Sequence, residues 1–183
     1  MKYKTIYADP PWLEVGGGKI CRGAQQHYPV MKTKDIIAMS GFIKSISEDN
    51  CHLYLWVTNN FLPDGLQVMK AWDFEYKTII TWIKDRFGLG QYFRGNTEHC
   101  LFGVKGVLPY KIVDEKRQQG VTGFNAPRTE HSRKPEQMRS MITKVSYPPY
   151  IELFARTNDE TLFGNIHDGW DVWGNEVESD IAI

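Results

Sequence analysis

Hydrophobic residues along the chain fall into two patterns that alternate from one end to the other. Short, nearly continuous apolar runs, such as His-Leu-Tyr-Leu-Trp-Val at 52–57, are typical of strands buried on both faces of a sheet. Apolar residues that recur every three or four positions indicate helices. We expect strands at 2–8, 52–57, 76–83, 99–105, 150–155 and 171–173, and helices at 33–46, 61–72 and 135–145.

A threonine and two prolines mark where the expected helices begin. Thr33 suits the N-cap of the first helix, because its hydroxyl can accept a hydrogen bond from a backbone amide of the first turn. Pro63 fits the first turn of the second helix, and Pro135 fits the first position of the third. Strands that alternate with helices predict an α/β fold with a mostly parallel sheet. The expected loops are 13–29, 85–96 and 106–134.

The composition is that of an ordinary globular chain. Of its 183 residues, 42% are hydrophobic and 24% are charged, and we expect a single domain over 1–183. No apolar run is long enough for a membrane helix, and the first residues lack the apolar core of a signal peptide. Cys21, Cys51 and Cys100 are odd in number and widely spaced. This argues for a reducing, cytoplasmic location and against a disulfide framework or structural zinc.

Charge is distributed unevenly, although the formal net charge is zero. Residues 105–144 hold nine Lys and Arg against four Asp and Glu, whereas residues 157–183 hold seven Asp and Glu and no Lys or Arg. This asymmetry predicts a basic surface that could take a phosphate backbone, with an acidic segment elsewhere. Charge alone fits solvated faces without a partner equally well.

The most informative motif is Asp9-Pro10-Pro11-Trp12, which directly follows the first expected strand. Each proline fixes φ and lacks a backbone donor, so the strand should end in a stiff corner whose carbonyls are free to accept hydrogen bonds. A carboxylate, a free carbonyl and an aromatic ring at one strand end suit a planar ring that carries an amino group, such as adenine.

Other polar residues also follow the ends of expected strands, namely Thr58, Lys84 and Arg156. In an open α/β sheet, ligands bind in the crevice at the carboxyl ends of the strands. We therefore expect Asp9 and these three residues to share one crevice.

Together with six further sequence blocks, the motif resembles the MT-A70 family. This family includes the catalytic subunit of the eukaryotic mRNA N6-adenosine methyltransferase and many bacterial and phage adenine methyltransferases. The blocks occur in the family's order and span nearly the whole chain. They are residues 8–12, 55–58, 82–84, 98–106, 131–136, 151–156 and 169–175. One departure is the segment 157–168, which is longer than the corresponding loop of the family.

The resemblance implies a Rossmann-like methyltransferase fold with helices on both faces of the sheet. It also implies a permuted order, in which the catalytic motif precedes the cofactor strand. The implied reaction is transfer of a methyl group from S-adenosylmethionine to N6 of adenine. The catalytic residues would be Asp9, Pro10, Pro11 and Trp12, with the Asp9 carboxylate and the Pro10 carbonyl holding the target amino group.

The resemblance assigns further residues around this motif. Trp12 and Tyr28 would sandwich or gate the target base, and Lys134 would lie near both the cofactor and the target. The other substrate-binding candidates are Lys84, His131 and Arg133. The cofactor-binding candidates are Tyr7, Asp9, Lys134, Arg156, Asn175 and Glu176, the last at a position where the family often has glutamine.

The nucleic-acid substrate is expected to be DNA rather than RNA, because a short catalytic domain resembles the bacterial and phage members. No segment is long enough for a separate target-recognition domain, so we expect relaxed or very short sequence specificity, or a partner chain. Three alternatives remain: an RNA adenosine N6-methyltransferase, a non-catalytic nucleic-acid-binding subunit of a methyltransferase complex, and transfer to cytosine N4. We expect no metal and no membrane association, and a homo- or hetero-oligomer fits the sequence.

Overall fold

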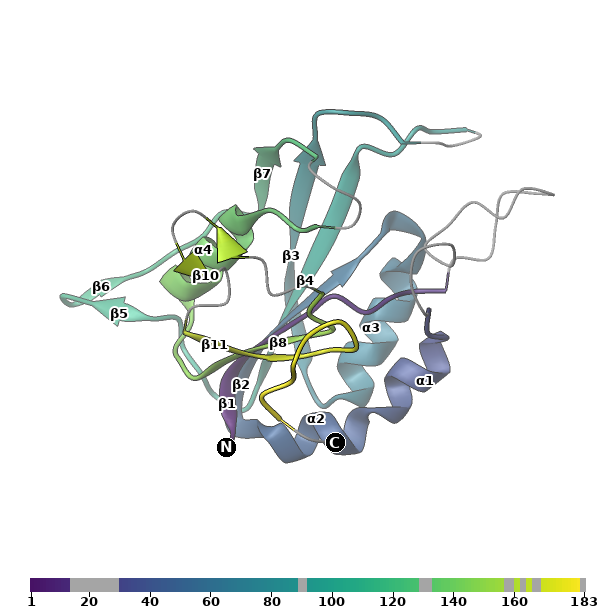
Figure 1. Ribbon diagram of the computed structural model, residues 1–183. Helices are drawn as coiled ribbons and strands as arrows, with labels where there is room; N and C mark the ends of the chain where they lie inside the picture. The colour runs from purple at the N-terminus through teal and green to yellow at the C-terminus, as the bar shows by residue number, and fades with distance from the viewer. Residues whose placement is uncertain are drawn as a thin grey trace.

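A seven-stranded sheet forms the centre of the protein, in the order β11-β8-β1-β2-β4-β3-β7 (Figure 1). The computed structural model describes residues 1–13, 30–88, 92–128, 133–156, 160–161, 164–165 and 169–181. All six strands expected from the sequence are confirmed within these residues, and β7 is added to them. The strands of the sheet are β1 (Tyr3–Ala8), β2 (Ser47–Val57), β3 (Glu75–Lys84), β4 (Thr97–Lys105), β7 (Gly123–Ala126), β8 (Tyr150–Leu153) and β11 (Trp170–Trp173).

Every strand of this sheet except β4 runs in the same direction. Strands β11, β8, β1 and β2 are successive parallel neighbours, and β3 is parallel to β7. Strand β4 is antiparallel to both β2 and β3. The prediction of a mostly parallel sheet is therefore confirmed. The carboxyl ends of six strands and the amino end of β4 lie at one edge, which we call the carboxyl edge.

Helices cover both faces of the sheet, as expected (Figure 1). One face carries α1 (Thr33–Ala38), α2 (Ser40–Ile46) and α3 (Leu62–Ala71), the last preceded by a 3-10 turn at Asn59–Phe61, and the other face carries α4 (Glu136–Val145). Side chains of strand β2 pack into the hydrophobic cores on both faces of the sheet. Leu53 and Leu55 are buried with α1–α3, whereas Tyr54 and Trp56 are buried with α4. Burial on both faces explains why its sequence is a nearly continuous apolar run.

Two expected helix boundaries are corrected. The helix expected at 33–46 is two helices, which meet at Met39. Thr33 is not an N-cap: Lys32 occupies that position, and the Thr33 hydroxyl donates instead to the Asp64 carboxylate at 2.7 Å. This bond ties α1 to α3, so tertiary packing overrides the local capping preference. Pro135 is the N-cap of α4 rather than its first residue, while Pro63 lies in the first turn of α3 as expected.

The segment 106–134 is not simply a loop. It contains a hairpin of β5 (Ile112–Val113) and β6 (Lys116–Arg117), and it supplies edge strand β7. The hairpin turns at Asp114 and Glu115, both with positive φ. Asn-Gly or Asp-Gly is the usual signal for such a turn, so Asp-Glu gave no indication of it. Within 157–168, β9 (Glu160–Thr161) pairs with β10 (Gly164–Asn165), and the expected loop 13–29 lies almost wholly outside the described residues.

Cys51 and Cys100 are buried free thiols, and Cys21 lies outside the described residues. Among the described helices, none is long and apolar enough to cross a membrane.

Two helical glycines give a matched test of packing. A Cβ at Gly65 of α3 would lie 2.4 Å from Val57 Cγ1 and 2.9 Å from Leu101 Cδ1, whereas a Cβ at Gly41 of α2 would meet nothing within 4 Å. Gly65→Ala should lower the free energy of unfolding by about 1–3 kcal/mol through overpacking. Gly41→Ala should leave it unchanged or raise it by up to about 1 kcal/mol. Urea denaturation measures both, and equal effects would contradict the close packing of α3 on the sheet.

Candidate active site

Strand β1 delivers Asp9 to the carboxyl edge beside β8. The two strands are parallel and in register, with Ala8 opposite Leu153, and the Asp9 amide donates to the Leu153 carbonyl at 3.4 Å. Asp9 is therefore a neighbour of the turn that follows β8. The prolines at 10 and 11 then end the strand, because neither can donate to the ladder.

The corner after Asp9 is closed by backbone hydrogen bonds. The Trp12 amide donates to the Pro10 carbonyl at 2.9 Å, and the Met31 amide donates to the Pro11 carbonyl at 2.7 Å. The expectation that these carbonyls are free is therefore corrected: each already accepts one bond. A carbonyl oxygen has two lone pairs, so Pro10 retains the capacity to accept another donor.

The Trp12 side chain is an anchor for the corner. Its indole N–H donates to the Trp56 carbonyl at 2.9 Å, its ring stacks on Phe61 with centroids 5.2 Å apart, and the residue is 6% exposed. Strand β2 and the 3-10 turn thus hold the corner in place. In this structure the ring is covered, so its stacking on a target base stays a prediction.

A chain of ion pairs crosses the carboxyl edge from β1 to β3. Lys134, just before α4, places its Nζ 2.7 Å from Asp9 Oδ2 and 2.9 Å from Glu98 Oε1. The other Glu98 oxygen, Oε2, lies 2.8 Å from Lys84 Nζ. Arg156 Nη2 lies 3.9 Å from Asp9 Oδ2 at the opposite end. Three of the four residues expected to share a crevice, Asp9, Lys84 and Arg156, are therefore joined by one network.

Burial and neighbouring charges shift the pKa values of this network in opposite directions, and the neighbouring charges have the larger effect. Burial alone would raise the pKa of Glu98, but Lys134 and Lys84 outweigh it and hold the pKa below its ordinary value. Burial alone would lower the pKa of Lys134, but Asp9 and Glu98 hold it above its ordinary value. Lys134 is therefore a protonated ammonium at neutral pH, shared between two carboxylates.

Glu98 is the member of the network that sequence reasoning did not single out. It is the second residue of the apolar strand β4 and is 8% exposed. A lone acid inside an apolar strand was the available signal, because a buried carboxylate requires cationic partners.

The remaining expected residues are placed less centrally. The fourth crevice residue, Thr58, follows β2, and its buried hydroxyl has no hydrogen-bond partner within the described part of the chain. Arg133 lies beside Lys134, with its Nη2 3.6 Å from Glu136 Oε1. Tyr28 and His131 lie outside the described residues, so their roles stay predictions.

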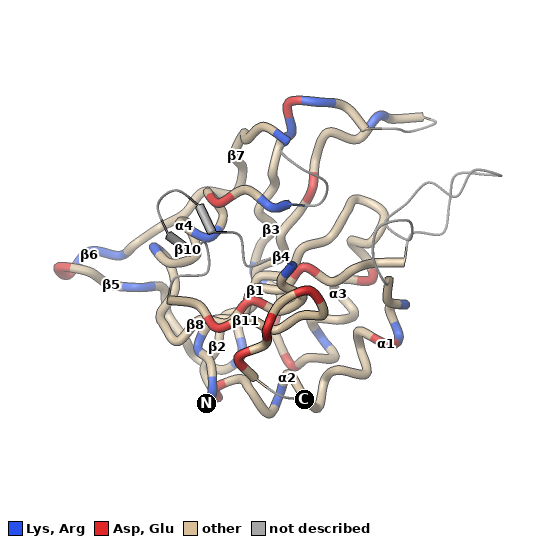
Figure 2. Tube along the Cα trace, in the orientation of Figure 1, with Lys and Arg blue, Asp and Glu red and all other residues tan. Residues whose placement is uncertain are grey.

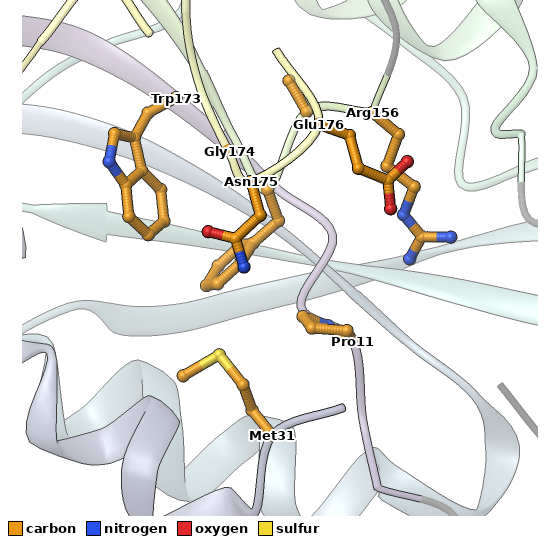
Figure 3. A pocket seen from close by; sticks show the side chains of 9 residues that line it. Pro11, Met31, Arg156, Trp173, Gly174, Asn175 and Glu176 are labelled. Carbon is orange, nitrogen blue, oxygen red and sulfur yellow. The ribbon is translucent and has the colours of Figure 1, made fainter. Parts of the chain in front are cut away.

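A pocket opens next to Asp9, between the ends of β1, β8 and β11. Figure 3 shows Asn175 between Trp173 and Pro11, with Met31 across the opening. The residues that line the pocket are Pro11, Met31, Phe154, Ala155, Arg156, Trp173, Gly174, Asn175 and Glu176. The cofactor candidates Arg156, Asn175 and Glu176 are thus brought together. Tyr7 does not line this pocket: it is buried beneath α4, where its hydroxyl accepts from the Trp56 indole at 2.7 Å.

The backbone of the pocket is tightly constrained. Phe154 has φ of 62°, which is uncommon for an aromatic residue and marks local strain of the kind that clusters at ligand sites. A Cβ at Gly174 would lie 2.2 Å from the Ala155 carbonyl oxygen. Only glycine therefore allows the segment after β11 to approach the segment after β8. Sequence reasoning missed Phe154, Trp173 and Gly174, because the contacts that matter are between distant segments.

The basic segment 105–144 is only partly a surface. Lys134 is held in the network, and Arg139 pairs with Glu152 under α4. Lys116 and Arg117 lie on the β5–β6 hairpin, whose turn carries Asp114 and Glu115, and Figure 2 shows this hairpin away from the acidic segment that follows β11. The charge count thus overstated the basic surface. Among the described residues, no group of three or more His, Cys, Asp or Glu could hold a metal ion.

Replacing Glu98 tests the network. Glu98→Gln should lower the free energy of unfolding at pH 7 by about 1–3 kcal/mol, because two lysines lose a charged partner. The folded pKa of Glu98 lies below its ordinary value of 4.5, so its contribution is present above that pH and is lost as the pH falls through the folded pKa. The difference from wild type should therefore shrink in acid. Urea denaturation at several pH values measures this.

Glu136→Gln is the matched control. The Glu136 side chain is 64% exposed, and its Oε1 lies 3.6 Å from Arg133, so its loss should change stability by less than about 1 kcal/mol. Equal effects of the two substitutions at pH 7 would contradict the role given to Glu98.

Comparison with known proteins identifies the family of the chain. A family model described as MT-A70 matches residues 3–176. The chain is 32% identical over 198 residues to the type II methyltransferase M.MunI of Mycoplasma sp. The aligned region covers 96% of this chain and 78% of that protein. It is 25% identical over 198 residues to the N(6)-adenosine-methyltransferase catalytic subunit METTL3 of Homo sapiens, covering 97% of this chain and 28% of that protein.

A plant relative also matches nearly the whole chain. The chain is 26% identical over 189 residues to an N(6)-adenosine-methyltransferase MT-A70-like protein of Arabidopsis thaliana, covering 96% of this chain and 24% of that protein. The chain therefore spans most of the Mycoplasma protein but about a quarter of the plant and human proteins. The family model alone covers nearly the whole chain, and the chain belongs to the MT-A70 family of methyltransferases.

Proposed function

We propose that this methyltransferase uses S-adenosylmethionine to methylate N6 of adenine in nucleic acid, with DNA favoured. The observation that carries the proposal is the position of Asp9. Its carboxylate lies at the carboxyl edge, held by Lys134 at 2.7 Å, directly beside a pocket lined by Arg156, Asn175 and Glu176. An acceptor of amino hydrogens and a separate polar pocket therefore lie side by side.

The pocket suits the proposed cofactor. The Glu176 carboxylate can accept from ribose hydroxyls, and the Asn175 amide can both donate and accept. The rings of Phe154 and Trp173 supply apolar surface for an adenine ring. When bound, S-adenosylmethionine supplies a methyl group on a positively charged sulfur, so the acceptor nitrogen needs positioning more than deprotonation. Asp9 does not itself line the pocket, but its ion-pair partner Arg156 does, so Asp9 can hold the acceptor close to the bound cofactor.

The corner would hold the acceptor by its two amino hydrogens. One N–H of the adenine N6 would donate to the Asp9 carboxylate and the other to the remaining lone pair of the Pro10 carbonyl. The nitrogen lone pair then points away from both acceptors, toward the methyl group. As N6 gained the methyl group, Asp9 or water would accept the amino proton that the nitrogen loses. Lys134 keeps the carboxylate oriented throughout.

The target adenine must leave its stack to reach Asp9, which costs a few kcal/mol in a duplex and little in a single strand. We favour DNA because the chain is more similar to a bacterial type II methyltransferase than to subunits named for adenosine.

We further propose that residues 1–183 act as one domain with the catalytic motif preceding the cofactor strand, alone or as an oligomer. Buried free thiols at Cys51 and Cys100 support a cytoplasmic location.

Methyl transfer to oligonucleotides tests the proposal. Wild type should transfer labelled methyl groups to adenine-containing DNA, and nucleoside analysis should identify N6-methyladenine. Asp9→Asn keeps the shape of the side chain but removes its charge, and should lower kcat/KM at least about a hundredfold. RNA of the same sequence should be a poorer substrate.

The control variant is Asp73→Asn, at the end of α3, where the backbone has φ of 72° that asparagine tolerates. It should retain wild-type activity. Calorimetry with S-adenosylmethionine separates an inactive scaffold, which does not bind it, from an enzyme that lacks a partner. Absence of N6-methyladenine from every substrate, or full activity of Asp9→Asn, would overturn the proposal.

A further inference from the structure

The hairpin of β3 and β4 carries an exposed aromatic tip. We call the described residues between the two strands, 85–88 and 92–96, the β3–β4 tip. Figure 1 shows the two arms extending beyond the body of the protein. Tyr92 and Phe93 are each 91% exposed, and Phe87 is 62% exposed. Burying one such ring is worth about 1.5–3 kcal/mol elsewhere in a protein, so these rings contribute little to folding. Three aromatics gathered on one projection indicate a binding surface rather than scattered exposure.

The arms of the tip are held in a defined geometry. The Lys84 amide donates to the Asn96 carbonyl, and the Gly88 amide donates to the Gly95 carbonyl, both at 2.7 Å. Arg94 closes the arrangement, because its Nε donates to the Gly88 carbonyl at 3.0 Å and its guanidinium lies 5.8 Å from the Phe87 ring centroid. The exposed rings are therefore carried on paired arms, which reduces the ordering cost of binding.

The base of the tip is part of the candidate active site. Lys84 ends β3 and Glu98 is the second residue of β4, and these two are ion-paired at 2.8 Å. Glu98 also pairs with Lys134, which pairs with Asp9. This network joins the base of the tip to the proposed position of the target base. A nucleic acid that places an adenine at Asp9 would pass beside the tip.

The charges of the tip suit a nucleic acid better than a protein. Arg86 and Arg94 flank the rings, and the Arg86 side chain is 78% exposed. The acid among them, Asp85, accepts from the Arg128 amide at 2.8 Å, and its other oxygen lies 3.8 Å from Arg86 Nε in an exposed ion pair. Arg94 has further N–H donors beyond its Nε, and a guanidinium matches the geometry of a phosphate. Aromatic faces beside arginines are the usual means of holding unpaired bases and their backbone.

We propose that Tyr92 and Phe93 stack on bases of the nucleic-acid strand next to the target adenine, while Arg86 and Arg94 contact its phosphates. This inference rests on the proposed function and assigns its substrate contact to the β3–β4 tip. Stacking accepts any base, so the tip adds affinity without specifying a long sequence. It also stabilises the unstacked strand that the reaction requires.

Three double variants and a control test the assignment in one experiment. Tyr92→Ala with Phe93→Ala removes both rings, Tyr92→Leu with Phe93→Leu keeps apolar area without ring faces, and Tyr92→Trp with Phe93→Trp keeps ring faces. The control is Tyr76→Ala, since Tyr76 is 43% exposed at the opposite end of β3. Fluorescence anisotropy with an adenine-containing single strand and its duplex measures affinity, and methyl transfer measures KM and kcat.

The alanine pair should weaken single-strand binding and raise KM by about tenfold or more, with kcat within about twofold of wild type. The leucine pair should also bind weakly, whereas the tryptophan pair and Tyr76→Ala should match wild type. Unchanged affinity and KM in the alanine pair, or full affinity in the leucine pair, would overturn the stacking role.

Sedimentation of the same variants detects the rival occupant, a protein partner or second copy. Loss of an oligomer with unchanged DNA affinity would show that the tip is a protein interface and would overturn the inference. If wild type itself neither binds nor methylates any oligonucleotide, the proposed function fails, and the inference fails with it. If wild type binds and methylates an oligonucleotide, and the alanine pair has the same affinity and KM as wild type, only the inference fails.

Discussion

The buried ammonium of Lys134 is the interaction on which the site depends. It lies within 3 Å of two carboxylates, Asp9 just after β1 and Glu98 in β4, that would repel each other without it. Because Glu98 also pairs with Lys84, the cation links the motif at one end of the chain to the hairpin in the middle. Removing one partner of such a buried pair is far more costly than removing a surface pair. Stability and the proposed activity are therefore coupled here: the same contacts that hold the sheet edge together orient the carboxylate that we propose to be catalytic.

The sheet supplies the second constraint. Strand β1 lies between β2 and β8, so the residue that follows it, Asp9, has neighbours on both sides. On the β2 side, the Trp12 indole fixes the corner to the Trp56 carbonyl. On the β8 side, Gly174 allows two turns to approach closely enough to form a pocket. The carboxylate and the pocket are thus adjacent because parallel strands end at the same edge, which is the general location of ligands in open α/β sheets.

Much of this could be predicted from the sequence, and the reasons are local. Two prolines after an apolar run marked the corner at Asp9, and apolar runs marked every strand of the seven-stranded sheet except the edge strand β7. The features that sequence reasoning missed or predicted wrongly depend on contacts between residues distant in sequence. Thr33 prefers Asp64 to its own helix, the β5–β6 turn uses Asp114 and Glu115 instead of a glycine, and Glu98 is meaningful only once Lys134 is beside it. Charge counting likewise treated Lys134 as surface, because a composition cannot distinguish a paired cation from an exposed one.

A double-mutant cycle between Glu98 and Lys134, measured as kcat/KM for methyl transfer, tests most directly whether Glu98 acts on Asp9 through Lys134. Glu98→Gln, Lys134→Met and the double variant would be compared with wild type, with urea denaturation confirming that each variant is folded. If the lysine transmits the effect of Glu98, the double variant should be no slower than Lys134→Met alone, which is strong non-additivity for residues in contact. Losses that multiply, so that the double variant is slower by the product of the two single effects, would contradict this account.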